Sequence, residues 1–315
     1  MRRLAPLAML LVLAAAATSA QAEPARYPSR TIEIVVAYGA GGSTDIVARA
    51  LAQKLQDRFG QSVVVLNKPG ASGTIGAALA ARANADGYTL YLGYTSETAV
   101  VPQLSRNIKY SLDDFAPIAV TGLVPLVLIT ANKLRANNLP ELIAELRAQP
   151  GKFTYGGSLG SPSHIMGAWF NRVAKLEVVH IPYCGGGQGV ADVVGGHALA
   201  AAAKAAIDSA AVKALAVTGE ARSSALPQVP TFKEAGVKDL ELASWTVLLA
   251  PEGTPADVLA LLRHATALAL ADPKVRALYA AQGIEASPTQ DARAFLAAER
   301  AKFGRVVRDL GITMD

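Results

Sequence analysis

The sequence predicts an α/β protein with two lobes, in which each lobe is a mostly parallel sheet flanked by helices. Between residues 34 and 98, strand-like segments alternate with loops rich in glycine or hydroxyl side chains and with helical segments. The same alternation begins again near residue 125. Because strands that alternate with helices are typical of parallel sheets, each series indicates one sheet.

The first unit contains the most distinctive loop of the chain. A β-branched strand at residues 34–38 precedes it, and a helical segment follows from residue 46. The loop reads Gly39, Ala40, Gly41, Gly42, Ser43, Thr44 and Asp45. Ser43, Thr44 or Asp45 can cap the helix, and free amides at a helix start favour an anion. Two interpretations stay open, an anion-binding loop and a plain strand-to-helix turn.

Two nucleotide-binding motifs do not fit this loop. In a dinucleotide fingerprint the third glycine would fall at Thr44, and an acidic residue is missing near Asn67, where the second strand ends. A P-loop would need a Gly-Lys-Ser/Thr sequence, which does not close the loop. The loop therefore predicts neither kind of nucleotide site.

Two more units follow the first. A strand at 63–66 leads into the loop 67–73 and a helix at 74–83, and a strand at 89–93 leads into the polar residues 94–98. In open parallel sheets, ligands bind beyond the carboxyl ends of the strands. All three loops lie at such ends, so the sequence predicts a ligand site there.

The second half of the chain repeats this alternation and then ends in helices. Strands are expected at residues 126–130, 153–155, 178–183, 214–218 and 244–250. Helices are expected at residues 139–149, from 164 to about 173, and at 190–194, 198–211, 232–236, 254–271, 273–282 and 288–310. Crossings near Leu126 and Trp245 assign residues 23–125 and 246–315 to lobe I, and residues 126–245 to lobe II.

Residues 1–22 have the pattern of a secretory signal peptide. Arg2 and Arg3 form a basic start, residues 4–17 an apolar core, and residues 20–22 a small-residue cleavage site. The apolar core is too short to span a membrane comfortably. We therefore expect cleavage and export rather than a membrane anchor.

Composition excludes several classes of function. The formal net charge is +5 and no cluster of Lys and Arg is interleaved with aromatic residues, so nucleic-acid binding is not expected. Cys184 is the only cysteine, which rules out an internal disulfide. His180, His197 and His264 lack the spacing of zinc ligands. We expect neither a metal nor a cofactor.

Several short segments occur along the chain in a characteristic order and spacing. They are Tyr27-Pro28, residues 41–45 with Ala48-Arg49, residues 67–73, Gly160-Ser161 with His164, residues 181–183, residues 215–218, Leu226-Pro227 with residues 229–231, residues 234–236, and Ala250-Pro251 with residues 253–255. In this order and spacing the chain resembles the periplasmic solute-binding proteins of the tripartite tricarboxylate transporter type, also called Bug proteins. The resemblance covers essentially the whole mature chain and implies a periplasmic location.

The resemblance implies the two-lobed periplasmic-binding-protein fold, closing on a small ligand that is usually a carboxylate or is amino-acid-like. It implies delivery to membrane transporter subunits or to a sensor, and we expect a monomer without catalytic activity. Carried over, the ligand-binding residues are Tyr38, Gly42, Ser43, Asp45, Ser72, Thr95, Ser96, Ser161, Ser163 and His164. For His164, a purely structural role beside its helix is an open alternative.

Two segments of lobe II depart from the family pattern. Family members usually have a lysine after the Pro-Tyr pair, and this chain has Cys184 there. After Gly195-Gly196 the family usually carries an aspartate and a phenylalanine on a strand, whereas residues 197–201 read His-Ala-Leu-Ala-Ala. We therefore expect an altered wall in lobe II and an altered ligand specificity.

The rival interpretation is a secreted serine hydrolase. Residues 156–160 have the spacing of a nucleophile elbow centred on Ser158 and follow a predicted strand. Asp192 or Asp208, and then His264, would complete the chain order of an esterase triad. Pro162 argues against this alternative because it interrupts the helical turn that the elbow needs.

Overall fold

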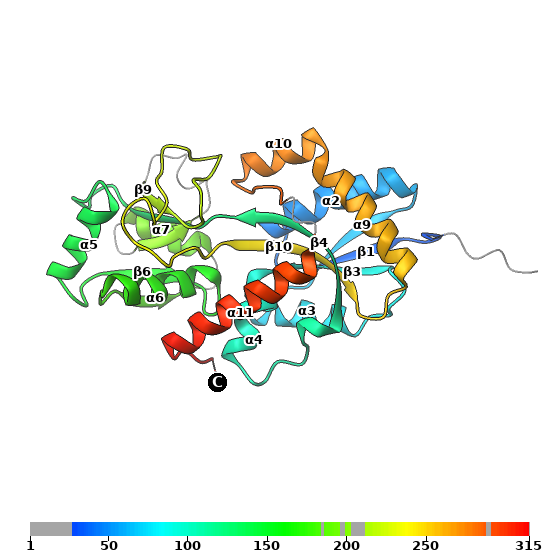
Figure 1. Ribbon diagram of the computed structural model, residues 1–315, viewed down its shortest axis with the longest axis horizontal. Coiled ribbons are helices and arrows are strands. Elements are labelled where there is room, and N and C mark those ends of the chain that lie inside the picture. Colours follow the sequence, from blue (N-terminus) through cyan, green and yellow to red (C-terminus); the bar gives the residue numbers. More distant parts are fainter. Residues whose placement is uncertain (1–26, 184–185, 196–198, 203–211, 288–290, 315) are drawn as a thin grey trace, which may run out of the picture.

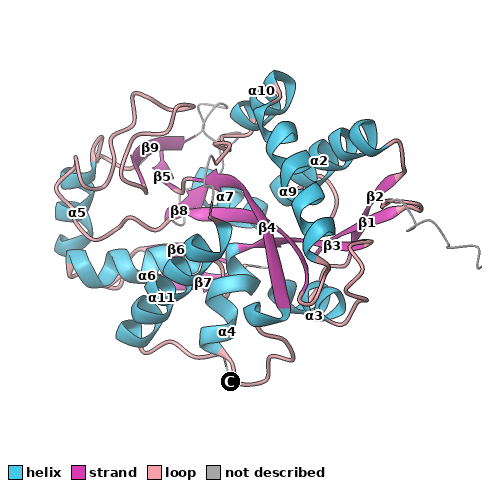
Figure 2. Cartoon of the chain, turned by 45° about the vertical axis from the view of Figure 1, so that its right-hand side comes forward, coloured by secondary structure: helices cyan, strands magenta, loops and turns pink. Residues whose placement is uncertain are grey.

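The computed structural model describes residues 27–183, 186–195, 199–202, 212–287 and 291–314. Its strands form two five-stranded sheets, one in each half of an elongated molecule (Figure 1). Helices lie on both faces of each sheet (Figure 2). This arrangement confirms the predicted two-lobed α/β fold.

The sheet of the first half has one reversed strand. In spatial order its strands are β2 (Val63–Asn67), β1 (Ile32–Val36), β3 (Thr89–Tyr94), β10 (Ser244–Pro251) and β4 (Phe115–Val124). β1 runs parallel to β2 and β3, whereas β10 runs antiparallel to β3 and β4. The sheet is mostly parallel, as expected, and the C-terminal part of the chain supplies its reversed strand.

Alternate residues of these strands pack on opposite faces of the sheet. Ile34 and Leu248 lie in a core with three helices, α2 (Ser43–Phe59), α9 (Ala256–Ala271) and α10 (Pro273–Ala281). Val35 and Val247 lie in a core on the other face, with α3 (Thr74–Ala81), α4 (Val101–Leu104) and α11 (Ala292–Leu310). The sheet is therefore covered on both sides, as its β-branched and leucine-rich strands require.

The sheet of the second half has the same pattern of directions. In spatial order its strands are β7 (Val179–Pro182), β6 (Thr154–Gly157), β8 (Leu199–Ala202), β5 (Val127–Ala131) and β9 (Val212–Val217). β6 runs parallel to β7 and β8, and β5 runs antiparallel to β8 and β9. Leu128 packs with α5 (Leu139–Ala148) and α6 (Pro162–Ala174), whereas Ile129 packs towards α7 (Gly186–Gly195).

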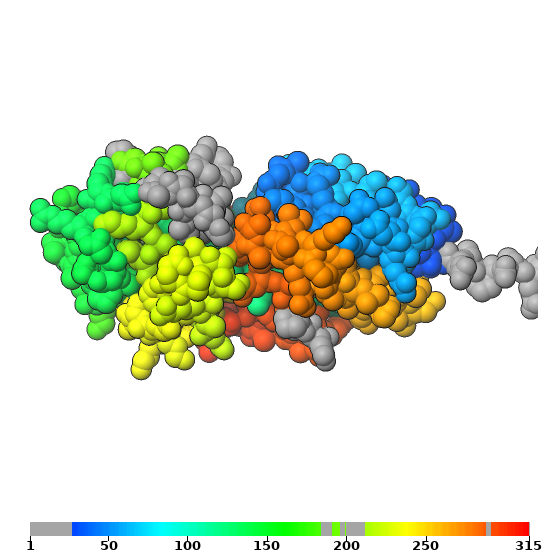
Figure 3. All heavy atoms as spheres, turned by 90° about the horizontal axis from the view of Figure 1, so that it is seen from above, coloured from blue at the N-terminus to red at the C-terminus, as the bar shows by residue number. Residues whose placement is uncertain are grey.

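The chain passes between the sheets twice, after β4 and between β9 and β10. Helix α11 lies along the junction, where Phe303 shares a core with Ile165 of α6. Figure 3 shows the two halves from above as two masses that meet at this junction. β10 already begins at Ser244, two residues before the expected start of the second part of lobe I. The lobe boundaries stay a prediction.

Three expectations about local structure are wrong or incomplete. Residues 199–202 form β8 rather than the expected alanine-rich helix, because their backbone pairs with β5 and β6 and helix propensity is only a weak preference. Residues 232–236 form turns instead of a short helix. Strand β4 was not expected at all. Residues 203–211 lie outside the described residues, as does the signal segment 1–22.

The helices of the described residues give one further finding. None of them combines the length and the hydropathy that a membrane span needs.

Three short helical turns complete the architecture, at Ala71–Gly73 (η1), Ser96–Val100 (η2) and Leu112–Asp114 (η3). The first two matter below because they follow β2 and β3.

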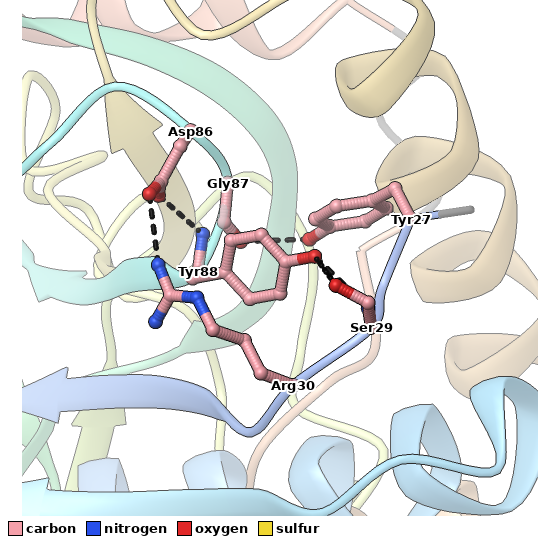
Figure 4. Close-up of polar contacts among 6 residues, drawn as sticks. All are labelled: Tyr27, Ser29, Arg30, Asp86, Gly87 and Tyr88. Carbon is pink, nitrogen blue, oxygen red and sulfur yellow. Dashed lines mark hydrogen bonds and ion pairs between the residues drawn. The ribbon is translucent and has the colours of Figure 1, made fainter. Parts of the chain in front are cut away.

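The first described residues are fixed to the turn that precedes β3. The residues involved are Tyr27, Ser29, Arg30, Asp86, Gly87 and Tyr88 (Figure 4). The Tyr88 hydroxyl accepts a hydrogen bond from the Ser29 amide at 2.9 Å, and its ring packs edge-on against Tyr27. Arg30 stacks over the Tyr88 ring at 3.9 Å and pairs with Asp86 at 2.9 Å. Tyr88 is thus the central residue of this N-terminal cluster of contacts.

We expect Tyr88→Ala to lower the free energy of unfolding by about 2 kcal/mol, because it removes a ring contact, a hydrogen bond and the surface under Arg30. Arg30→Ala should cost less than about 1 kcal/mol, because the side chains of the Arg30–Asp86 pair are 60% and 40% exposed. Urea denaturation measures both values. Equal losses in the two variants would contradict the central place of Tyr88.

Candidate functional site

Loops from both sheets meet at the junction of the two halves. In the first sheet the loops that make contact follow β2 and β3, and in the second sheet the loop 158–161 follows β6. The Ser72 hydroxyl donates to the carbonyl oxygen of Leu159 at 3.2 Å. The Ser96 hydroxyl donates to the carbonyl oxygen of Gly160 at 2.9 Å. The loops at the carboxyl ends of the two sheets therefore face each other and touch.

The loop after β1 leaves the start of α2 open. Gly42 is the N-cap, and no side chain caps the helix. The expected cap by Ser43, Thr44 or Asp45 is wrong, because the helix already begins at Ser43. The first backbone hydrogen bond of the helix runs from the Ile46 amide to the Gly42 carbonyl at 3.0 Å, so the preceding amides lack helical partners. Ser43 is exposed, whereas Thr44 and Asp45 are buried, so of these amides that of Ser43 is the best placed for an anion.

Asp45 braces this loop from inside. Its carboxylate is only 2% exposed and accepts hydrogen bonds from the Gly41 amide at 2.9 Å, from Arg49 Nε at 2.8 Å and from Asn67 Nδ2 at 3.0 Å. Burial by itself would raise the pKa of Asp45, but these hydrogen bonds hold it below its usual value. Asp45 thus joins the loop after β1 to the end of β2, and its carboxylate is engaged within its own lobe.

Thr95 faces β10. Its hydroxyl accepts from the Trp245 amide at 2.6 Å and donates to the Trp245 carbonyl at 3.1 Å. The side chain is fully buried, so its hydrogen-bonding capacity is used inside lobe I. Thr95 fixes the loop after β3 to the sheet, while the next residue, Ser96, reaches across the junction.

The Tyr38 hydroxyl is also engaged within lobe I. It donates to Glu97 Oε2 at 2.6 Å, and its ring packs edge-on against Tyr94 with centroids 5.7 Å apart. Burial, followed by the proximity of Glu97, raises the pKa of Tyr38 well above its usual value. Tyr38 is therefore a neutral phenol, half-buried beneath the loops.

The start of α6 supplies the hydroxyl groups of lobe II. Ser161 is the N-cap, and its hydroxyl accepts from the His164 amide at 3.3 Å. The hydroxyl groups of Ser161 and Ser163 lie 2.8 Å apart and form a hydrogen bond. Both residues are only partly buried. A helix start with two adjacent hydroxyl groups offers several donors to an anion at the junction.

His164 is neutral and lies behind this loop. Its Nδ1 accepts a hydrogen bond from the Gly160 amide at 3.3 Å, and its ring stacks on His180 with centroids 4.1 Å apart. Burial, with a smaller effect of His180, lowers the pKa of His164 to about 4. This geometry favours the structural role that the sequence left open, because the ring supports the 158–161 loop.

The ten predicted ligand-binding residues fall into two groups. Gly42, Ser43, Ser161 and Ser163 are exposed or only partly buried at the starts of two helices. Within this group Ser161 and Ser163 hydrogen-bond to each other. The remaining six form hydrogen bonds to other parts of the protein, and these are Tyr38, Asp45, Ser72, Thr95, Ser96 and His164. Direct contact of any of the ten with a ligand stays a prediction.

Sequence reasoning missed the residues that hold these loops in place. Asn67, at the end of β2, donates to both Asp45 and the Tyr38 carbonyl. Glu97 accepts hydrogen bonds from two tyrosines and is fully buried. One signal was available, since Glu97 is the only charged residue between Thr89 and Ser105.

The structure does not assemble a serine hydrolase triad from the described candidates. Ser158 follows β6 in the second half, whereas His264 lies on α9, which packs against the first sheet. The Asp192 carboxylate accepts a hydrogen bond from the Tyr183 hydroxyl. Helix α6 begins only at Pro162, so Ser158 does not lie at a strand-to-helix elbow.

Metal binding is likewise not indicated. Within the part of the chain that the structure describes, no group of three or more His, Cys, Asp or Glu side chains is placed to hold a metal ion. Cys184, His197 and Asp208 lie outside the described residues. The described loops instead offer backbone amides and hydroxyl groups.

Comparison with known proteins identifies the family. The model of the tripartite tricarboxylate transporter family receptor matches residues 47–312. The chain belongs to this family. Receptors of the family are periplasmic binding proteins and not enzymes, so the hydrolase alternative has no support.

Relatives and solved structures resemble this receptor over almost its full length. Protein BugT of Bordetella pertussis is 38% identical over 312 residues, covering 96% of this chain and 95% of BugT. The structure of R. palustris Rpa4515 with adipate is similar with a TM-score of 0.84 and 32% identity, covering 91% of this chain and 99% of that one. MatC from Rhodopseudomonas palustris with bound malate gives a TM-score of 0.78 and 28% identity, covering 89% of this chain and 100% of that one.

Proposed function

We propose that this receptor captures a small carboxylate between its two lobes and delivers it to membrane transporter subunits. The observation that carries the proposal is the meeting of the two sets of loops, through Ser72 and Leu159 and through Ser96 and Gly160. These contacts join the loops after β2 and β3 to the loop that precedes α6, and the proposal adds the start of α2 to the same junction. Support also comes from the similar proteins Rpa4515 and MatC, which hold adipate and malate, both dicarboxylates.

The chemistry of the loops suits a carboxylate. The Ser43 amide at the start of α2 and the hydroxyl groups of Ser43, Ser161 and Ser163 are donors on exposed or partly buried residues. Arg49, the cation nearest the first loop in sequence, is paired with Asp45. Recognition would therefore rest on neutral donors and on the helix dipoles, with each hydrogen bond to a charged group worth about 1.5–3 kcal/mol.

Binding at one lobe alone would be weak. A micromolar ligand needs about 8 kcal/mol, which exceeds what one helix start and a few hydroxyl groups supply. Donors from both lobes supply enough only if the lobes close on the same ligand. Ligand binding would then shift the population towards the closed arrangement, since only that arrangement makes both sets of contacts.

The family also supports proposals about export, oligomeric state, lobe boundaries and contact residues. We propose export through cleavage after residue 22, a monomeric receptor, and lobes formed by residues 23–125 with 246–315 and by residues 126–245. The ten residues named from the sequence form the proposed contact set, with Asp45, Thr95 and His164 acting mainly by holding the loops. Delivery to a sensor instead of a transporter is the alternative destination.

A thermal-shift screen of the mature protein tests the proposed function. The compounds are mono-, di- and tricarboxylates and amino acids, each added at millimolar concentration. We expect at least one carboxylate to raise the melting temperature in a concentration-dependent way, because a ligand that binds only the folded state stabilises it. No stabilisation by any anionic compound would contradict the assignment.

A further inference from the structure

A fully buried glutamate lies beneath the loops of lobe I. Glu97, in η2, accepts hydrogen bonds at both carboxylate oxygens. Oε1 accepts from the Tyr91 hydroxyl at 2.8 Å and from the Tyr94 amide at 2.5 Å, whereas Oε2 accepts from the Tyr38 hydroxyl at 2.6 Å. A Cβ on Gly73 would lie 3.0 Å from Oε2, so the loop after β2 rests on the same carboxylate. Glu97 therefore touches all three loops of lobe I.

Among the residues that the structure describes, Glu97 has no cation as a partner. The titratable side chains that face it are all tyrosines, namely Tyr38, Tyr91, Tyr94 and Tyr110. From the opposite side, α11 packs apolar residues such as Phe303 into the core that contains Ala99 and Val100 of η2. Among the described residues, no Lys, Arg or His forms an ion pair with Glu97. Burial outweighs the hydrogen bonds and raises the pKa of Glu97 to about 7.

The hydrogen-bond pattern indicates that protonation of Glu97 occurs at Oε2 and that the Tyr38 hydroxyl then reorients. Oε1 has two donors, so a proton added to the carboxylate is placed most easily on Oε2, which has one. The Oε2–H group then donates to the Tyr38 oxygen, and the hydroxyl hydrogen of Tyr38 must turn to another acceptor. Tyr38 directly precedes the glycine loop that opens the start of α2. The Ser96 side chain already hydrogen-bonds to Tyr38, so the acceptor is either Ser96 or an anion bound beside it.

We propose that Glu97 is a positioning residue that takes up one proton when a carboxylate binds, so that Tyr38 turns its O–H from Glu97 towards the ligand. This proposal rests on the proposed function and adds that ligand binding is coupled to the uptake of one proton. The proton comes from solvent and is held on Glu97 Oε2, while Tyr38 remains neutral throughout. A second negative charge near an already uncompensated carboxylate favours the same uptake, because like charges raise each other's pKa.

Isothermal titration calorimetry tests the proposal with the carboxylate that stabilises the protein most. Titrations in two buffers with different enthalpies of ionisation give the number of protons taken up per ligand bound. At pH 8.5 the wild type should take up close to one proton, and at pH 5.5 close to none, because Glu97 is then already protonated. Affinity should fall by up to tenfold for each pH unit above 7, since a bound proton is linked to a bound ligand.

Three variants separate positioning from general stability. Glu97→Gln, an isostere of the protonated form, should take up no proton at any pH and should bind with an affinity independent of pH. Tyr38→Phe should lose the uptake and bind more weakly, which decides the matter if Glu97→Gln does not fold. Glu299→Gln is the matched control, because Glu299 is a second buried glutamate, bound to Trp245 and Lys302, and its loss should leave the uptake unchanged.

The outcomes distinguish this proposal from the proposed function. A tight ligand that binds the wild type at pH 8.5 without proton uptake overturns the role of Glu97 and leaves carboxylate capture standing. If Glu97→Gln takes up as many protons as the wild type, the role of Glu97 is likewise overturned and carboxylate capture still stands. If no carboxylate binds at all, the proposed function fails, and this proposal fails with it.

Discussion

Replacing Asp45 with alanine is expected to weaken carboxylate binding about tenfold or more and to lower the free energy of unfolding by about 2–3 kcal/mol. The substitution removes one buried acceptor and leaves the Gly41 amide, Arg49 Nε and Asn67 Nδ2 without it. Gly41 and Arg49 are exposed and Asn67 is partly buried, so the loss comes from the buried charged acceptor that joins these three donors. The amides at the start of α2 would then no longer be held in one arrangement. Calorimetric titration and urea denaturation measure the two effects.

Asp57 provides the control on the same helix. It is exposed, and the hydrogen bond that its carboxylate accepts comes from Gln53 at 2.9 Å on the surface of α2. Asp57→Ala should therefore leave both affinity and stability close to those of the wild type, as surface substitutions usually do. An Asp45→Ala variant with unchanged affinity would show that the loop after β1 does not take part in binding.

Gly76→Ala is expected to lower the free energy of unfolding by about 3 kcal/mol, although alanine is the better helix former. Gly76 lies on α3, where an added Cβ would lie 2.9 Å from the Cα and Cβ atoms of Ala37 and 2.9 Å from the Lys68 carbonyl oxygen. These atoms belong to the backbone and the first side-chain atom of the loops after β1 and β2, so they cannot move independently. The variant should push both loops away from α3 and weaken binding as well.

Gly39 is the matched control for this substitution. An added Cβ there has no neighbouring atom within 4 Å, and its φ is not in the left-handed region. Gly39→Ala should leave the free energy of unfolding within about 0.5 kcal/mol of the wild type. Equal stability of Gly76→Ala and Gly39→Ala in urea denaturation would disprove the close approach of α3 to the loops.

The alternation of strands and helices was sufficient to predict both sheets, because β-branched runs such as residues 63–66 leave few alternatives. It was not sufficient for β8, where alanines favour a helix locally and only pairing with β5 and β6 makes a strand. It also missed β4, whose place at the edge of the first sheet depends on β10, far along the chain. Such pairings are set by tertiary packing and leave little local signal.

The candidate site was likewise predictable in part: its place in the fold was, but the orientation of its side chains was not. Loops rich in glycine and hydroxyl groups placed the site at the carboxyl ends of the strands, and the structure brings those loops together at Ser72 and Ser96. The orientation of individual side chains could not be derived, since Asp45 and Thr95 turn inwards to partners that lie elsewhere in the sequence. Glu97 was overlooked because only the assembled cluster of tyrosines shows what it does.

We expect both lobes to bind one carboxylate at their junction, and a crystal structure of the protein with its most stabilising carboxylate decides this. The ligand carboxylate should lie within hydrogen-bonding distance of both the Ser43 amide at the start of α2 and the hydroxyl group of Ser161 or Ser163. A ligand bound to one lobe only, or away from the junction, would refute binding between the lobes.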